Sequence, residues 1–507
     1  MAEKKNFDSD FCGSLPLNNV NLIQSYGYLL VLDRAVLNII QLSENTEELL
    51  DKKPQELIDT NIADYFESDD IDQLKSVIGK QISDKVPVSL TLKDKGGKML
   101  CLLHSKPDYL ILELEKSDRK SERYFTSVFQ EVKYSMAAIE QASSVKDVSE
   151  VAIHELRKLS GFDGILMYQF DKDWNGTVIA EEKDPRLEPY MGQKFPASDI
   201  PKQARQLYLK NPYRLISDRD YTPIRLYPII NPVTRAFIDL SECNLRSVPA
   251  VHLEYMKNMG IKASMSIRVI RNEELWGLIS CHNIEAKFIN FEVCSVFELL
   301  STFISNKISS ILNKEDYDFL TVLQQKRAAL IEHVYASDDI FSGMLENNPE
   351  EFLGLFEATG AAVILNGRTE TAGRVPDLDA IDNLALWLES KNINRVFATD
   401  NLSSLYDEAE EYANIASGII VVPIDGAKGE YIIWFRPEIV ETINWGGDPN
   451  KAINFEKDGK NYHPRNSFML WQETVSQFSS PWQKHELDVA ETLRNFLYEF
   501  RTRQLYN

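Results

Sequence analysis

A long apolar stripe in the middle of the chain constrains the fold most. Apolar residues recur there at intervals of three or four, the spacing of one helix face: Val293, Phe297, Leu300, Ile304, Ile308 and Ile311. We predict a helix that continues, with a break near Asn313, towards Leu345. Because a chain of 507 residues is too long for one hydrophobic core, this helix is expected to link separate domains.

The segment before the helix has the pattern of two small α+β domains. The first is predicted to contain strands at 28–32, 86–92, 99–104 and 109–114, helices at 46–50 and 71–78, and a turn at 95–97. The second begins with a helix over 148–159 and continues with two hairpins, 164–168 with 177–180 and 264–270 with 275–282. Asn175-Gly176 is the strongest turn signal of the first hairpin, and Arg271 to Glu274 form the turn of the second.

A third domain follows the long helix. Its expected strands are 361–365, 418–422 and 431–435. Ser480-Pro481-Trp482-Gln483 predicts the start of a last helix, as a capping box with proline at the first helical position. That helix carries an apolar stripe, which is either part of the core or a dimer seam: Val489, Leu493, Phe496 and Phe500.

Charge and cysteine content exclude several classes of protein. A net charge of −22 opposes binding to nucleic acid or to anionic lipid. No apolar run is long enough to span a membrane, and the polar first residues lack signal-peptide character, so we expect a cytoplasmic protein. Five widely spaced cysteines without a CxxC pair favour neither disulfides nor zinc: Cys12, Cys101, Cys243, Cys281 and Cys294. The last four lie in apolar surroundings and are expected to be buried, whereas Cys12 lies in a polar arm.

Two segments of the second domain carry candidate binding residues. In the run 195–201, Ser198 or Asp199 can cap a helix that has Pro201 in its first turn and stops at Asn211. Capping alone is the simpler explanation for an aspartate there.

The other segment contains Arg246 and then a helix with His252 and Tyr255 on one face, together with Met256 and Met259. Donors also follow on the next two strands: Ser264, Ser266 and His282. Such a cluster suits an anionic ligand, although a helical His–Tyr pair is more often structural. No third ligand stands at metal-binding spacing, so no zinc site is predicted from the two histidines.

In the third domain, residues 431–438 are followed by a glycine-rich stretch and by 462–468, which include Arg465. We interpret this as a long arm with an arginine on its returning limb. A loop of that length within a compact domain usually has a function.

Seven motifs occur in an order that resembles the PAS–GAF–PHY photosensory module of bacterial phytochromes, over nearly the whole chain. They are Cys12, Ile23-Gln24, PASDIP at 196–201, the His252 helix, LWGLISCH at 275–282, WFRPE at 434–438 and PRNSF at 464–468. The resemblance implies an α+β fold of three tandem domains with antiparallel sheets, joined by long helices. Its parts would be an N-terminal arm (1–18), PAS (19–120), GAF (130–312) and PHY (316–507). It also implies an N-terminal figure-of-eight knot and a PHY tongue at about 428–470.

The function that the resemblance implies is that of a red/far-red photoreceptor and not of an enzyme. Bacteriophytochromes attach biliverdin IXα by a thioether to a cysteine placed like Cys12. The alternative attachment position, next to the helix histidine, is Val251 here. Light would drive Z/E isomerisation of ring D and refolding of the tongue.

The family's site residues carry over to matching positions in this chain. Asp199 is similar to the residue that binds the pyrrole N–H groups and faces the tongue arginine, here Arg465. His252 matches the histidine near the inner rings, and His282 matches the one that binds ring D. Further cofactor-binding positions are the aromatic walls and Ile200 (Tyr168, Tyr190, Phe195, Ile200, Tyr208 and Tyr255) and the propionate partners (Arg214, Arg246, Ser264 and Ser266). Ile23 would thread a lasso drawn from residues 219–249.

Departures and alternatives accompany the resemblance. Ser25-Tyr26 follows Gln24 where relatives often have Pro-His, and Asn283 follows the second histidine where relatives often have another. A truncated phytochrome histidine kinase is one alternative, but too few residues follow His485 for a nucleotide-binding domain. A GAF sensor of small ligands such as cyclic nucleotides is the other. Expected partners are a bilin, a second copy of the chain and a downstream kinase or other effector.

Overall fold

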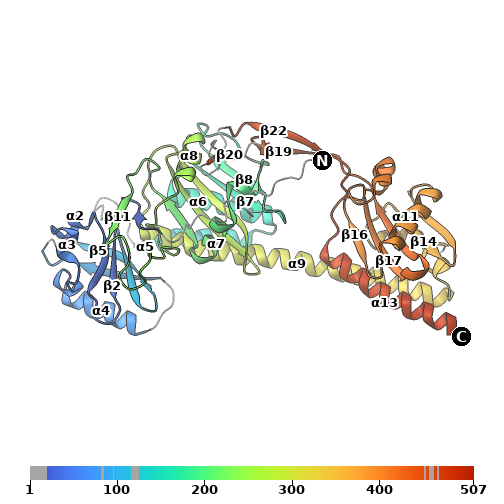
Figure 1. Ribbon diagram of the computed structural model, residues 1–507, viewed down its shortest axis with the longest axis horizontal. Helices are drawn as coiled ribbons and strands as arrows, with labels where there is room; N and C mark the ends of the chain where they lie inside the picture. Colours follow the sequence, from blue (N-terminus) through green and yellow to red (C-terminus); the bar gives the residue numbers. More distant parts are fainter. Residues whose placement is uncertain are drawn as a thin grey trace. The chain divides into compact units, whose positions relative to one another are not determined.

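The computed structural model describes residues 20–80, 85–94, 96–115, 125–346, 348–449, 453–455, 462–464 and 467–506 (Figure 1). The chain divides into two compact units. One comprises Met1–Ile311 with Asn444–Trp471, and the other comprises Leu312–Ile443 with Gln472–Asn507. Among the described residues, no helix is both long and apolar enough to cross a bilayer.

The first domain is built on a seven-stranded antiparallel sheet of order β1-β11-β3-β2-β6-β5-β4. Its strands are β1 (Leu22–Ile23), β2 (Gly27–Asp33), β3 (Ile39–Ser43), β4 (Val86–Thr91), β5 (Lys98–Ser105), β6 (Tyr109–Glu115) and β11 (Ile224–Tyr227). Its helices are α2 (Thr46–Leu50), α3 (Pro54–Leu57) and α4 (Ser68–Gly79). Strand β11 comes from the second domain's sequence, so the two domains share this sheet.

Both faces of the central strands are covered, which explains their continuous apolar sequence. In β2, Leu30 and Leu32 pack into the cluster formed with the helices. Leu29 and Val31 face the other way, against a cluster that includes Ile238, Leu240, Cys243 and Leu245 from the second domain. The predicted strands and helices of this domain are confirmed, whereas β3 was not predicted.

The second domain contains an eight-stranded sheet of order β10-β12-β13-β7-β8-β9-β19-β22. Its strands are β7 (Gly164–Phe170), β8 (Gly176–Lys183), β9 (Lys194–Phe195), β10 (Tyr213–Ile216), β12 (Ala263–Arg271), β13 (Glu274–Asn283), β19 (Glu441–Gly446) and β22 (Leu470–Val475). Its helices are α5 (Phe125–Gln141), α6 (Val145–Ser160), α7 (Lys202–Lys210) and α8 (Ala250–Asn258). A separate pair, β20 (Ile453–Phe455) and β21 (Tyr462–Pro464), forms a two-stranded sheet.

Both predicted hairpins form, but the predictions for their turns have different outcomes. In the second hairpin, Asn272 and Glu273 have φ of 51° and 65°, as the two central residues of a type I′ turn require. The prediction of a tight turn at Asn175-Gly176 is wrong, because Phe170 pairs with Gly176 and the loop comprises residues 171–175. Gly176 instead lies in the strand under the ring of Tyr168, where a Cβ atom would come within 1.7 Å of that ring.

The long helix α9 (Phe291–Ser337) is continuous, so the predicted break at Asn313 is wrong. An asparagine inside a helix costs only about 0.7 kcal/mol relative to alanine, which the flanking helix-forming residues offset. The helix ends before Asp338, whose φ is 51°, and one π-helical turn (Ser342–Glu346) follows.

The third domain has a five-stranded antiparallel sheet of order β15-β14-β18-β17-β16. Its strands are β14 (Gly360–Leu365), β15 (Arg368–Gly373), β16 (Phe397–Thr399), β17 (Gly418–Asp425) and β18 (Glu430–Arg436). Its helices are α10 (Pro349–Gly354), α11 (Leu378–Ser390), α12 (Ala413–Ala416) and α13 (Lys484–Tyr506).

The last helix differs from its prediction at the start. It begins at Lys484 and not at Pro481. Gln483 is the residue at the N-cap position, because its backbone amide donates to the Glu486 carboxylate at 2.7 Å. The terminal apolar stripe belongs to the core. Val489, Leu493 and Phe500 are at most 4% exposed, and Phe496 packs against the same cluster.

Candidate functional site

A cavity of about 240 Å³ lies in the second domain, and two smaller ones measure about 20 and 10 Å³. Its walls come from strands β7, β12 and β13, helices α7 and α8, and the segments that precede these helices. Along β7, Leu166 and Tyr168 line the cavity, whereas the alternating residues Ile165 and Met167 do not. The strand period of two therefore selects which side chains face the hollow.

Every second-domain residue that the sequence predicted for the site lines this cavity. These residues are Tyr168, Tyr190, Phe195, Asp199, Ile200, Tyr208, Arg214, Arg246, His252, Tyr255, Ser264, Ser266 and His282. Their contact with a cofactor stays a prediction. Cys12 and Arg465 lie outside the described residues, and Ile23 lies in β1 and not among the lining residues.

Two arginines give one side of the cavity positive charge. Arg214 lies on β10, opposite Ser266 of β12, and its guanidinium donates to the carbonyl oxygens of Asn244 at 2.8 Å and Ser247 at 3.1 Å. Burial, and next the charge of Arg214, lower the pKa of Arg246 to about 9. The fold thus holds two like charges close together, next to the serines of β12, which favours an anionic ligand.

Two histidines lie in the same cavity. His252 is on α8, with its ring nearly parallel to that of Tyr255 (10°) and 6.0 Å away between centroids. The His252 side chain borders the cavity and has exposed surface there. Desolvation by the surrounding protein, and then the charge of Arg214, lower the pKa of His252 to about 4. Burial, and then His252, likewise lower the pKa of His282 to about 4. Both imidazoles are therefore neutral at neutral pH and can both donate and accept hydrogen bonds.

The predicted capping role of Ser198 or Asp199 is wrong. Helix α7 begins at Lys202 with Pro201 as its N-cap residue, and no side chain caps it. Residues Ala197–Asp199 form a separate 3-10 turn, from which the Asp199 carboxylate accepts a hydrogen bond from the Tyr255 hydroxyl at 2.9 Å. Asp199 thus lines the cavity instead of serving the helix.

Residues from the long arm lie against the cavity within the same unit. Pro464 lines the cavity, and Phe468 packs edge-on against Tyr255 at 4.9 Å between centroids. His463 Nδ1 lies 2.9 Å from the Glu254 carboxylate of α8. Trp445 pairs with Lys194 of β9 in parallel register. The described arm residues 453–455 and 462–464 form strands β20 and β21.

Some lining residues were not predicted. Ser280 lines the cavity two positions before His282 on β13, so the strand period could have identified it. Pro464 had no comparable signal, because its place depends on how the arm folds back.

The two departures from the family pattern lie outside the cavity lining. The Tyr26 hydroxyl donates to the Asn244 carbonyl at 3.1 Å, and the Asn283 side chain accepts from the Asp163 amide at 3.1 Å.

Comparisons with known proteins agree with this architecture. Three family models match in succession: PAS fold over residues 12–117, GAF domain over 144–308 and phytochrome region over 323–505. Cyanobacterial phytochrome B of Nostoc is 37% identical over 96% of this chain, which spans 65% of that relative, slightly less than two thirds. A bacteriophytochrome of Xanthomonas campestris is 30% identical, and the match covers 96% of this chain and 78% of that protein. The crystal structure of bacteriophytochrome RpBphP3 from R. palustris has a TM-score of 0.85 at 35% identity and covers 97% of this chain and 99% of that one.

Proposed function

The chain belongs to the bacteriophytochrome family, with PAS, GAF and PHY domains in that order, and we propose that it is a red/far-red photoreceptor that holds biliverdin IXα in its GAF cavity. The proposal assigns it a sensory and not a catalytic role. Cytoplasmic location, homodimerisation and a downstream kinase or other effector are parts of the same proposal.

The observation that carries the proposal is the pair of arginines in an otherwise largely apolar cavity. Burying two guanidinium groups side by side is costly unless anions compensate them. Among the lining residues that the structure describes, Asp199 is the one carboxyl group, and it is bound by Tyr255. A ligand with two carboxylates matches Arg214 and Arg246, and biliverdin carries two propionates.

The remaining walls fit a flat conjugated ligand. The aromatic ring of Phe195 contacts those of Tyr168 and Tyr190, at 5.9 Å and 5.6 Å between centroids. Neutral His252 and His282 supply polar groups without further charge. A cyclic nucleotide is less well matched, because it carries one phosphate diester, whereas two guanidinium groups line the cavity.

When bound, biliverdin would supply red-light absorption and Z/E isomerisation at its ring D. In the proposed roles, His282 binds ring D and the Asp199 region contacts the pyrrole groups. Tyr255 then joins the site to the tongue, because its hydroxyl donates to Asp199 and its ring packs on Phe468. A change around Asp199 would reach the tongue through this side chain, in addition to the cavity contact of Pro464. We propose that Arg465 lies opposite Asp199 and that the tongue exchanges strand for helix under red light.

The proposed knot has support in contacts near the N-terminus. Ile23 forms a bridge with Arg246, and the Gln24 amide donates to the Leu245 carbonyl at 2.7 Å. The Gln24 side chain also donates to Leu215 and Asn244 carbonyls at 2.9 and 3.2 Å. We propose that Ile23 threads the lasso, as the family resemblance implies.

The test is the absorption spectrum of the chain produced together with a haem oxygenase. We expect a red-absorbing pigment that red light converts to a far-red-absorbing form. Cys12→Ser should release its pigment on denaturation, as judged by zinc-induced fluorescence of denatured protein bands. Cys281→Ser, a buried control, should retain it. A colourless protein would refute the function, and covalent pigment in Cys12→Ser would refute the attachment.

A further inference from the structure

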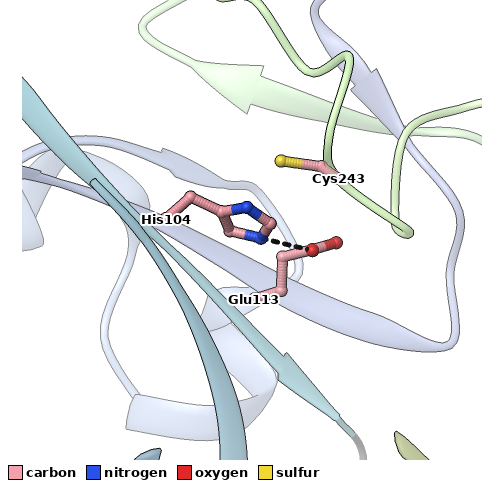
Figure 2. A group of neighbouring side chains, drawn as sticks. All are labelled: His104, Glu113 and Cys243. Atoms are coloured by element: carbon pink, nitrogen blue, oxygen red, sulfur yellow. Dashed lines mark hydrogen bonds and ion pairs between the residues drawn. The ribbon is translucent and has the colours of Figure 1, made fainter. Parts of the chain in front are cut away.

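A second group of polar side chains is buried away from the GAF cavity. His104 lies on β5 and Glu113 on β6 of the PAS sheet, and Cys243 lies in the loop that precedes Arg246. Their exposed fractions are 1%, 4% and 1%. Figure 2 shows the three side chains converging from the two strands and the loop. One donor atom from each lies within 4.8 Å of the other two.

The protein itself engages these donors only in part. His104 Nε2 lies 2.7 Å from one Glu113 oxygen, and the other Glu113 oxygen accepts the Leu245 amide at 2.6 Å. His104 Nδ1 is buried and has no hydrogen-bond partner among the described residues. Since buried polar atoms in proteins are nearly always paired, this nitrogen shows that the hydrogen bonding of the cluster is incomplete among the described residues.

The donor set fits a zinc ion in chemistry and charge. Imidazole nitrogen, carboxylate oxygen and thiolate sulfur are the three ligand types that zinc binds in proteins. One carboxylate, one thiolate and a neutral imidazole balance a divalent cation, so the site would bury no net charge. Softer thiolate coordination disfavours magnesium and calcium.

The geometry requires only a small rearrangement of the three donors. With metal–ligand distances of about 2.0–2.3 Å, two ligands of a tetrahedral site are about 3.3–3.6 Å apart. The 2.7 Å His104–Glu113 hydrogen bond is shorter than this spacing and must open by roughly 0.6 Å, whereas a separation of 4.8 Å must shrink by roughly 1 Å. We propose that His104, Glu113 and Cys243 form a zinc site, with one coordination position left for water.

The site would join the PAS sheet to the loop that leads to Arg246 of the GAF domain. Cys243 is followed by Asn244, whose carbonyl accepts hydrogen bonds from both Gln24 and Arg214. A bound ion would therefore fix the loop at the point where it contacts the N-terminal segment. This site could not be predicted from the sequence, because its donors come from two strands and a distant loop.

The experiment uses the full chain without an affinity tag, stripped with a chelator and titrated with Co²⁺ and Zn²⁺. We expect one saturable Co²⁺ per chain, with the near-ultraviolet thiolate charge-transfer band and visible bands of a tetrahedral site. Zinc should displace the cobalt and raise the melting temperature. Cys243→Ala should weaken binding at least about tenfold, whereas Cys294→Ala, another buried thiol, should leave it unchanged.

Three results would overturn the site. They are the absence of a thiolate–cobalt band in the wild-type chain, equal metal affinity in Cys243→Ala and Cys294→Ala, and no thermal stabilisation by zinc. The wild-type spectrum decides the matter even if Cys243→Ala fails to fold. Pigment that binds metal by itself would do so equally in both variants, so the difference between them isolates the protein site.

Discussion

The GAF and PHY domains both place helices on a largely antiparallel sheet, and within the part of the chain that the structure describes the cavity of about 240 Å³ lies at the GAF sheet. The cavity-facing positions of β12 and β13 include the small residues Ser264, Ser266 and Ser280. In the PHY sheet, one face is filled by large apolar residues that pack on α11: Ile419, Val421, Tyr431, Ile433 and Phe435 against Ile381, Leu384 and Leu388. Side-chain size on one sheet face thus separates a binding domain from a packed one.

The largest expected effect comes from removing a side chain from the packed PHY core. Trp434 is fully buried, lies 4.8 and 4.9 Å from the rings of Phe352 and Phe356, and donates to the Phe352 carbonyl. Trp434→Ala should lower the free energy of unfolding by about 3–5 kcal/mol. The control is Tyr208→Ala in the pigment-free chain, which should lose less because Tyr208 already borders a cavity. Urea titrations measure the free energy of unfolding of both variants. Equal losses would contradict the difference in packing between the two domains.

The reverse change should turn the GAF face into a packed one. Ser266→Leu places a large apolar side chain in the cavity and should weaken biliverdin binding by about 1–3 kcal/mol, or roughly 5- to 150-fold. Met265→Leu, on the opposite face of the same strand, keeps its volume and serves as the control. Pigment titration monitored by absorbance measures both. Undiminished affinity in Ser266→Leu would mean that the ligand lies elsewhere.

A smaller effect concerns pH. His282 has a pKa of about 4 in the folded chain, below the about 6.5 of an unfolded histidine. Between these values the unfolded state binds the additional proton, so the free energy of unfolding should fall as pH drops from about 6.5 to 4. In pigment-free His282→Gln this fall should be shallower. Urea titrations across that range measure the slopes, and identical slopes would contradict a neutral, buried His282.

The site residues that could be predicted from the sequence lie in regular helices and strands. His252 with Tyr255, and Ser264 with Ser266, lie at helix and strand spacing, so their common orientation toward the cavity could be predicted. Asp199 illustrates the limit, since its carboxylate could cap a helix as well as face a cavity, and only its hydrogen bond with Tyr255 decides between them.

Long-range packing accounts for most of what could not be predicted. Gly176 is a glycine because the ring of Tyr168 lies over it, and not because a turn requires one there. Likewise, Cys243 meets His104 and Glu113 only because the GAF loop packs on the PAS sheet.

The most direct test of the central claim is a crystal structure of the biliverdin-loaded chain. The account predicts pigment in the cavity between β12, β13, α7 and α8, with its two propionates within hydrogen-bonding distance of Arg214 and Arg246 and of the β12 serines. Pigment bound outside this cavity, or propionates directed away from both arginines, would contradict it.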